Sequence, residues 1–452
     1  MSLLLLSRIQ FSLTIMFHYI YPPLSIGLGL IILIMESIYM LTKDPLYHRL
    51  TKFWVKIFGL TFAIGVATGI VMEFEFGTNW STYSRYVGDV FGSALAAEGV
   101  FAFFLESGFL AILLFGWDKV RPIVHWFSAL MVCLGAHFSA IWIVVANSWM
   151  QTPAGFHIVG TGMHARAEIT DFRAMVFNPS SMERLAHVIS GAWIAGVFLV
   201  LSISAYYLLK QKNIPFAKAS MKVALILGIA ASLAQMITGR IAAETVAKWQ
   251  PTKLVAMEAH FPASAPGDFY PFGLVDEKNQ RVIGPKIPGF LSYLMYGKWD
   301  APVRGLESFK KEDLPPVAIT FYAYHLMILL GIVMILLMGI GLILFSKGTL
   351  FETKWYLKLL VPAVLLPQLA NQLGWTTAEV GRQPWIVYGL LRTSQGLSKA
   401  VQADAVLTSL IMFTLIYLLL FVLFIFLLDQ KIKQGPGGIE AQEETQTHRA
   451  ST

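Results

Sequence analysis

The chain has 452 residues, of which 56% are hydrophobic and only 13% are charged, and its mean hydropathy is +0.63. A soluble globular domain carries about 25% charged residues, so the composition excludes a soluble fold and indicates an integral membrane protein. The net charge of +7 does not indicate nucleic acid binding, because the basic residues lie in short loops between apolar segments. With one cysteine, Cys133, the chain can form neither a disulfide framework nor a cysteine-based metal site.

Nine apolar segments are long enough to cross a lipid bilayer, which takes about 20 residues in a helix. They cover residues 10–42, 52–74, 92–117, 122–149, 184–209, 218–246, 316–346, 355–379 and 402–430. The first ten residues show no signal-cleavage pattern and continue into the first segment, so we expect that segment to be retained. The sequence therefore predicts an all-α integral membrane protein with nine transmembrane helices.

Basic residues in the short loops predict the orientation of these helices. Alternate loops hold twelve basic residues in very short connections: Lys43, Arg49, Lys52, Lys119, Arg121, Lys210, Lys212, Lys218, Lys347, Lys354, Lys431 and Lys433. The loops on the opposite side hold fewer basic residues, spread over longer segments. We expect the basic side to face the cytoplasm, which places the N-terminus outside and the C-terminus in the cytoplasm.

The predicted helices divide the chain into four parts. Residues 1–246 hold helices one to six, residues 247–315 form a long outer loop, residues 316–430 hold helices seven to nine, and residues 431–452 form a disordered cytoplasmic tail. Loops as long as the outer one are usually functional or disordered. Its aromatic residues favour an ordered lid over a plain extracellular loop; they include Phe269, Tyr270, Phe272, Tyr293, Tyr296 and Trp299.

Two histidines and a methionine lie in the outer halves of predicted spans. For His18, in the first span, a hydrogen bond to a neighbouring helix and ligation of a metal or heme are equally open interpretations. His187 opens the fifth span and Met327 lies in the seventh, and each alone is typical of an interfacial or packing residue. Together, a histidine and a methionine can fill both axial positions of a heme iron.

A second set of polar residues is predicted to form a ladder from the cytoplasm to the outer half of the membrane. Glu98 and Glu106 are eight residues apart in the third span, which places them within about 80° on one face and about 12 Å apart in depth. A single buried carboxylate is explained by helix packing, but two on one face indicate an ion or proton path. The order of the spans adds three residues at matching depths: Lys56, His125 and Ser139.

A further carboxylate, Glu379, ends the eighth apolar run, and Arg382 follows it with a fixed positive charge. Ionisable residues at membrane depth are rare and usually functional, so we expect a functional site here. By contrast, Glu73 and Glu75 alternate with aromatic residues between spans two and three. There we expect an amphipathic interfacial loop.

Several motifs occur in a fixed order along nearly the whole chain except the tail. They are residues 72–80, 98–106, 115–118, 145–153 and the Gly-Arg-Gln-Pro-Trp motif at 381–385, which follows Trp375 and Glu379. In these motifs the chain resembles subunit I of the cytochrome bd-type quinol oxidases, specifically the version with the shorter outer loop. Independent motifs in the right order are far more specific than one short motif.

The resemblance implies an electrogenic quinol:oxygen oxidoreductase, which oxidises ubiquinol or menaquinol, reduces oxygen to water and generates a membrane potential without proton pumping. It implies that His187 and Met327 are the axial ligands of a low-spin heme b. His18 and Glu379 are then ligands of a high-spin heme b and a heme d, in an order left open. Trp375 lies between hemes in this family. Arg382 is expected to pair with Glu379 or with a heme propionate.

The resemblance also assigns Lys253 and Glu258, at the start of the outer loop, to the binding of quinol. A carboxylate can accept a quinol proton and a lysine can polarise the quinone oxygen, whereas a solvated charge pair is the alternative. Many family members carry an arginine two residues before the methionine ligand, where this chain has His325. The usual propionate contact is therefore in doubt at this position.

The resemblance implies a second, larger membrane subunit (subunit II), a possible small single-helix subunit, and a location in the prokaryotic cytoplasmic membrane. Two alternative functions remain open. One is the cyanide-insensitive branch of the family, which holds only b-type hemes and no heme d. The other is a proton-coupled transporter, although the sequence shows neither the inverted repeats nor the broken helices typical of that class.

Overall fold

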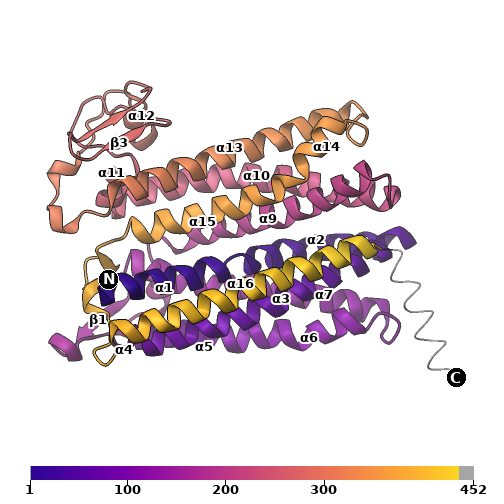
Figure 1. Ribbon diagram of the computed structural model, residues 1–452, viewed down its shortest axis with the longest axis horizontal. Helices are drawn as coiled ribbons and strands as arrows, with labels where there is room; N and C mark the ends of the chain where they lie inside the picture. The colour runs from indigo at the N-terminus through magenta and orange to yellow at the C-terminus, as the bar shows by residue number, and fades with distance from the viewer. Residues whose placement is uncertain (1, 437–452) are drawn as a thin grey trace.

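The computed structural model describes residues 2–436, which form a bundle of long helices that run nearly parallel (Figure 1). In Figure 1 the helices form two groups. The lower group holds α1 (Leu3–His18), α2 (Tyr21–Thr42), α3 (Pro45–Thr78), α5 (Gly88–Glu98), α6 (Phe104–Phe115), α7 (Pro122–Gln151) and α16 (Ala403–Gln434). The upper group holds α9 (Ser181–Leu209), α10 (Ile214–Trp249), α13 (Val317–Ser346), α14 (Lys354–Leu360) and α15 (Leu365–Val380).

Short elements connect the long helices. The short helices are α4 (Ser81–Tyr86), α8 (Phe172–Val176), α11 (Pro251–Met257) and α12 (Phe290–Tyr296). Three antiparallel hairpins pair β1 (Phe156–Val159) with β2 (Arg166–Ile169), β3 (Leu274–Asp276) with β4 (Arg281–Ile283), and β5 (Trp385–Val387) with β6 (Leu391–Arg392). These elements cap one end of the bundle, where the outer loop was predicted to lie (Figure 1).

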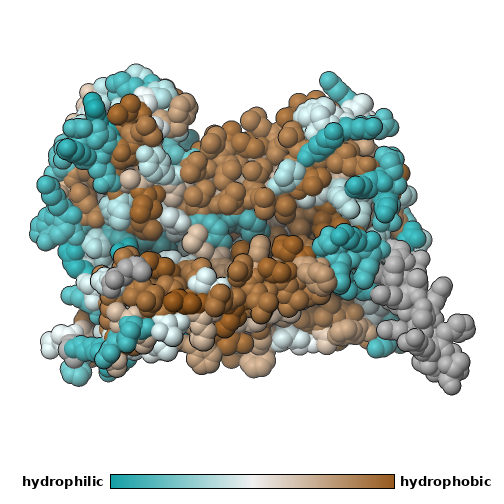
Figure 2. All heavy atoms as spheres, viewed as in Figure 1, coloured by the Kyte–Doolittle hydropathy of each residue, from teal (hydrophilic) through white to brown (hydrophobic). Residues whose placement is uncertain are grey.

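Within residues 2–436, eight helical segments are long and apolar enough to cross a membrane. They match eight of the nine predicted spans, so the helical membrane class is confirmed. Figure 2 shows hydrophobic residues across the middle of the molecule and hydrophilic residues at both ends, as a bilayer requires. The segment predicted as the eighth span is divided into α14, a 3-10 turn at Pro362–Val364 and α15, so neither helix reaches spanning length.

The first predicted span is also interrupted, which its hydropathy did not indicate. Helix α1 ends at His18, and α2 starts at Tyr21, followed by Pro22 and Pro23. Proline has no backbone N–H and cannot extend the hydrogen-bond ladder of the preceding helix. The break therefore places His18 at a helix end.

Helix α9 is the central helix of the bundle, with 83% of its most apolar stretch buried. It crosses α2 at close range through two glycines. A Cβ atom at Gly27 would lie 2.5 Å from the carbonyl oxygen of Ala192 and 2.8 Å from the backbone of Gly196. Only glycine allows this backbone approach, which fixes α9 against the first span.

Two predicted boundaries are corrected by the helices. Helix α3 continues to Thr78, so Glu73 and Glu75 lie on a helix and the predicted interfacial loop is wrong. The side chain of Glu75 is buried and accepts a hydrogen bond from Thr14 at 2.6 Å. Helix α16 continues to Gln434, into the predicted tail, and residues 437–452 of that tail lie outside the described residues.

The outer loop is built from α11, the β3–β4 hairpin and α12. Its aromatic residues contact one another: the ring centroids of Tyr293 and Trp299 are 4.9 Å apart, and both rings contact Phe290. A small apolar cluster under the loop includes Val255, Phe261 and Leu306. These contacts give the loop a core of its own at the end of α10 and α13.

Candidate functional site

His18 is held by two residues of α3. Its Nδ1 atom lies 3.0 Å from the hydroxyl of Thr68, which donates its own hydrogen to the carbonyl of Ile64 at 2.9 Å. Because the hydroxyl hydrogen is committed, Nδ1 carries the ring hydrogen and Nε2 keeps a lone pair. Gly69 leaves room for the ring, since a Cβ atom there would lie 3.3 Å from His18 Cε1. This arrangement presents Nε2 as a metal ligand.

His187 repeats this construction on α9 and α10. Its Nδ1 lies 3.2 Å from the Thr238 hydroxyl, which donates to the carbonyl of Ala234 at 2.9 Å. A Cβ atom at Gly239, the next residue, would lie 3.4 Å from His187 Cε1. The Nε2 atom faces the side-chain amide of Gln235 at 3.1 Å. Thr68 and Thr238 thus hold the Nδ1 atoms of the two histidines, and the Thr-Gly pair at each position is a signal visible in the sequence.

Met327 on α13 lies against α15, and α15 also packs on α9. A Cβ atom at Gly374 would lie 3.1 Å from the Met327 sulfur. The same helix carries buried amide groups without hydrogen-bond partners, on Gln368 and Asn371. Asn371 faces the α9 backbone, where a Cβ atom at Gly191 would lie 3.2 Å from its amide oxygen. Buried unpaired amides are costly, so this region is built to hold a further polar group.

Trp375 connects the two halves of the bundle. Its ring meets that of Tyr19 edge to face, with centroids 5.3 Å apart. Tyr19 is the residue at which α1 breaks, directly after His18. The contact therefore places the helix of Glu379 beside the His18 site, which the sequence did not show.

The carboxylate of Glu379 is surrounded by donors. It forms an ion pair with Arg382, and its Oε1 atom accepts hydrogen bonds from Asn147 at 3.1 Å and from Gln151 at 3.2 Å. Asn147 and Gln151 lie one turn apart on α7. Both belong to a motif that we noted in the sequence without assigning them a role.

Two more basic side chains join this cluster. Arg184 donates to the Asn147 amide oxygen at 2.5 Å, and the amine of Lys253 donates to the Gln151 amide oxygen at 2.6 Å. Lys253 is 2% exposed. Burial lowers the pKa of its amine well below the usual value, and the charges of Arg184 and Arg382 lower it further.

The cluster contains more basic groups than acidic ones. Arg184, Lys253 and Arg382 lie around the carboxylate of Glu379, and Glu183 adds a second carboxylate near Arg184. The buried Nη1 atom of Arg382 has no partner. Uncompensated buried cations are costly. The cluster is therefore suited to one or more additional anionic groups, such as the carboxylates of a cofactor.

Glu258 lies in a separate polar group from Lys253. Its carboxylate faces the Nε2 atom of His325 at 3.9 Å, and neither of these two facing atoms has a hydrogen-bond partner. The ring of His325 stacks on Phe269, and its Nδ1–H donates to the carbonyl of Phe321 at 3.0 Å. Burial raises the pKa of the Glu258 carboxyl to about 8. The two residues predicted to bind quinol thus lie at opposite ends of α11.

The predicted ladder is partly assembled. Ser139 donates to Glu98 at 2.7 Å, which agrees with their predicted similar depth. Glu106 is buried against α7, where a Cβ atom at Gly135 would lie 2.8 Å from its Cβ. A π-helical turn, Gly99–Phe103, separates the two glutamates and changes the angle between them. Such turns are rare and frequently occur at functional sites.

His125 has a partner that the sequence did not predict. Its Nδ1 atom lies 2.5 Å from Glu36 on α2, and its Nε2 atom lies 3.2 Å from the carbonyl of Leu113. Leu113 is seven residues beyond Glu106, so about 10 Å of helix separates His125 from Glu106. Glu36 is a carboxylate within an apolar run, the same signal that singled out Glu98. Lys56 is half-buried on α3.

These features fit heme. Two histidines present a free or amide-facing Nε2 atom, glycines clear space beside each ring, and the excess of basic side chains around Glu379 suits propionate groups. The fold and these side chains define an integral membrane protein with half-buried histidine, methionine and carboxylate donors.

Comparison with known proteins identifies the family. The family model of cytochrome bd terminal oxidase subunit I matches residues 6–436. Cytochrome bd ubiquinol oxidase subunit 1 of Bacillus subtilis (strain 168) is 41% identical over 446 residues, covering 96% of this chain and 94% of the relative. Cytochrome bd-II ubiquinol oxidase subunit 1 of Escherichia coli (strain K12) is 32% identical over 509 residues, covering 98% of each chain. The chain belongs to the cytochrome bd terminal oxidase subunit I family.

A solved structure agrees with this assignment. The bd oxidase of Geobacillus thermodenitrificans superposes with a TM-score of 0.87 at 29% identity, covering 96% of this chain and 99% of that one. The chain is therefore the subunit I of a terminal quinol oxidase, an integral membrane protein that binds heme and works with a subunit II. The transporter alternative is wrong, because residues 6–436 match an oxidase family.

Proposed function

We propose that this subunit carries a low-spin heme b, a high-spin heme b and a heme d, and that it oxidises quinol at its outer face while oxygen is reduced to water. His187 and Met327 would hold the low-spin heme, and His18 and Glu379 the other two. The observation that carries this proposal is the repeated His–Thr–Gly arrangement at His18 and His187. When bound, the hemes supply electron transfer and the binding of oxygen.

The protein groups hold and orient this cofactor set. Thr68 and Thr238 fix the tautomer of each histidine. Arg184, Lys253 and Arg382 neutralise carboxylates in a buried site, where charge-assisted hydrogen bonds are strong. Trp375, one turn before Glu379 on α15, contacts Tyr19 next to His18 and would lie between hemes. The b-heme-only branch of the family remains the second candidate, because the short outer loop occurs there too.

Protons for water formation enter from the cytoplasm. The route runs through Lys56, His125, Glu106 and Glu98 to Ser139, with Glu36 as the partner of His125. The chain crosses the membrane nine times, with its N-terminus outside, and the interrupted α14–α15 segment provides the eighth crossing. Quinol protons leave outside and water protons enter from inside, so a membrane potential forms without pumping.

Further partners follow from the same proposal. Quinol binds at the outer loop near Lys253 and Glu258, and the raised pKa of Glu258 suits a group that exchanges protons near neutral pH. Oxygen is the second substrate. A small single-helix subunit and a bacterial cytoplasmic membrane complete the assembly, as the bacterial origin of the matched relatives supports.

The reduced-minus-oxidised optical spectrum of the purified complex tests the cofactor assignment, because heme d absorbs far to the red of heme b. A spectrum with b-type bands alone would establish the second candidate. Glu106→Ala in proteoliposomes tests the proton route. We expect loss of quinol oxidase activity and of proton uptake from the inner side; normal values of both would refute the route.

A further inference from the structure

The β3–β4 hairpin of the outer loop has two different faces. Val275 and Val282 are directly paired and pack on the apolar cluster under the loop. Leu274 and Ile283 form the next pair, and because side chains alternate along a strand they point to the opposite face. That face is open: Phe272 and Leu274 are each 67% exposed, and Ile283 is 51% exposed. These last three residues are called the outward hairpin face below.

Two hydrogen bonds place the hairpin beside the first turns of α13. The carboxylate of Glu277, in the hairpin turn, accepts from the N–H of Ala318 at 2.9 Å, and the N–H of Val275 donates to the Tyr322 hydroxyl at 2.9 Å. Two residues of a strand span about 6.6 Å and four residues of a helix span about 6 Å, so the two segments run side by side. Leu274 therefore lies further along α13, toward the middle of the bilayer, than the turn does.

The neighbouring side of α13 is apolar and open. Ile319, Tyr322 and Leu326 are spaced for one helix face and are 54%, 37% and 47% exposed. A ring contact continues the alignment, since Phe269 and His325 stack with their centroids 5.8 Å apart. Figure 1 shows β3 and α12 beside the first turns of α13 and not beyond its end. The outward hairpin face therefore lies at the depth of a span, next to a helix side that a bilayer covers.

The residue types along the hairpin change in the order that a membrane boundary requires. At the turn, Arg281 and Asp276 form an ion pair at 3.2 Å, and the aliphatic pair and the phenylalanine of the outward face follow toward the bilayer. The next part of the loop exposes Tyr296 and Trp299, which are 52% and 53% exposed. Tyrosine and tryptophan are enriched where a membrane meets water. A protein partner does not require this order, so the face fits lipid best.

We propose that the outward hairpin face inserts into the bilayer at the boundary between headgroups and acyl chains, and that it anchors the outer loop to phospholipid. Apolar faces of surface elements enter this boundary by about 5–10 Å, which suits three adjacent apolar side chains. The occupant is lipid, and not subunit II or a second copy of this chain. The inference goes beyond the proposed function, because it concerns how the loop is held and does not depend on the hemes or the quinol.

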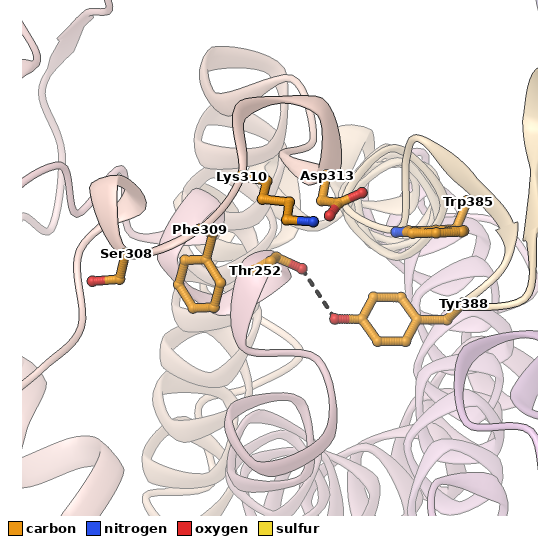
Figure 3. A pocket seen from close by; sticks show the side chains of 8 residues that line it. Thr252, Ser308, Phe309, Lys310, Asp313, Trp385 and Tyr388 are labelled. Atoms are coloured by element: carbon orange, nitrogen blue, oxygen red, sulfur yellow. Dashed lines mark hydrogen bonds between the residues drawn. The ribbon is translucent and has the colours of Figure 1, made fainter.

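The inner face of the same hairpin connects this anchor to a cleft of about 340 Å³ at the end of the bundle. Val275 and Val282 pack on the apolar cluster that Phe309 also joins. Phe309 lines the cleft, and Figure 3 shows it on the side opposite Tyr388, with Thr252 between them. Lipid contact on the outward face therefore stabilises one wall of the cleft through the cluster.

Photo-crosslinking in membranes tests the occupant. The intact complex with subunit II is placed in vesicles of phosphatidylethanolamine and phosphatidylglycerol, with p-benzoylphenylalanine at Leu274 or, as the matched control, at Lys278 in the exposed turn. Mass spectrometry of the irradiated loop peptide identifies the adducts. We expect phospholipid adducts at Leu274 at least about fivefold more often than at Lys278, because the turn lies outside the apolar boundary. Adducts at Leu274 with subunit II or a second copy of the chain, or equal lipid adducts at both positions, would overturn the inference.

Limited trypsin digestion in lipid nanodiscs gives an independent test of the anchor. The double variant Leu274→Thr with Ile283→Thr removes the aliphatic groups, and threonine keeps a high strand propensity. We expect cleavage after Lys278 and Arg281 to be about tenfold faster or more, because two side chains no longer hold the loop in lipid.

The matched control is Ile158→Thr, which changes an exposed isoleucine on the separate β1–β2 hairpin. This control should be cleaved in the outer loop at the rate of the wild type, and an unchanged heme spectrum shows that each variant folds. Equal rates for the double variant and the wild type would refute the anchor.

Discussion

The His18 and His187 sites share one local construction and differ in their surroundings. At each site, the hydroxyl of a threonine on a neighbouring helix is hydrogen-bonded to the histidine Nδ1 atom. The glycine that follows this threonine leaves space beside the ring. His187 lies within α9, the most buried helix, and its Nε2 faces Gln235. His18 ends α1 at a break, beside Tyr19 and the Trp375 ring.

The comparison shows that a Thr-Gly pair on a neighbouring helix orients the histidine. The packing of other helices determines which second donor side chain lies near it. A Thr-Gly pair on a neighbouring helix sets the tautomer wherever it occurs. The second donor comes from a distant part of the chain: Met327 approaches through Gly374 of α15, and Glu379 ends that same helix. Changes at the two sites therefore have separable effects.

The largest effect is expected from removing the histidines. His187→Ala and Met327→Ala should eliminate the same component of the reduced-minus-oxidised spectrum, whereas His18→Ala should eliminate a different one. Quinol oxidase activity should fall more than about 100-fold in each, since loss of even a supporting residue costs about 10–100-fold. If His18→Ala and His187→Ala lose the same spectral component, the two sites are not distinct.

Removing the supporting hydroxyls should have the next largest effect. Thr68→Val and Thr238→Val leave Nδ1 without its acceptor, so we expect about a 10–100-fold loss of activity or heme affinity, each confined to its own spectral component. Heme content per protein and oxygen consumption measure this loss. Thr68→Ser and Thr238→Ser keep the hydroxyl and should be near normal; equal losses in the serine variants would contradict the role of the hydroxyl.

The protonation of Glu258 should make stability depend on pH on the His187 side of the molecule. Glu258 contacts His325 on α13, the helix that carries Met327. Its pKa is raised to about 8, so between about pH 4.5 and 8 the unfolded chain releases this proton and the folded chain keeps it. The free energy of unfolding of the wild type should therefore fall as pH rises through this window, on the order of a few kcal/mol.

The Glu258→Gln variant serves as the reference for this measurement, because glutamine does not titrate. Heat-unfolding midpoints of the detergent-solubilised complex at pH 5 and pH 9 should differ more for the wild type than for the variant. An equal pH response of both proteins would show that Glu258 is ionised in the folded state at neutral pH.

The smallest effect is expected at the glycines. Gly69→Ala and Gly239→Ala each place a Cβ atom 3.3–3.4 Å from a histidine Cε1, a contact that a small ring shift relieves. Alanine also favours the helix by about 1 kcal/mol. We expect retained heme, a small displacement of the corresponding absorption band and a thermal stability within about 1 kcal/mol of the wild type. Loss of either heme would show that the rings cannot move.

Much of the architecture could be predicted from the sequence. Eight spans follow from apolar runs, since each must cover the bilayer with residues of its own. The similar depth of Glu98 and Ser139 followed from span order, and the structure joins them by a hydrogen bond. The order of motifs along the chain indicated the family before any contact was known.

Other features depended on contacts between distant segments. The π-helical turn between Glu98 and Glu106 has no proline within it and arises where the backbone adapts to its neighbours. The break after His18 and the division of the eighth segment coincide with prolines. Hydropathy averages over such breaks and does not show them. The pairing of His125 with Glu36 joins two helices that are 89 residues apart at these positions, which no local pattern encodes.

The sequence by itself determined the membrane class, the long helices and the identity of the donor side chains, because these depend on composition within single segments. Tertiary structure decided the partners of each donor. It separated Lys253 from Glu258, gathered Arg184, Lys253 and Arg382 around Glu379, and formed the cleft beside Thr252. Hydrogen bonds and ion pairs act over a few ångströms, so only the packing of helices remote in sequence settles which of them form.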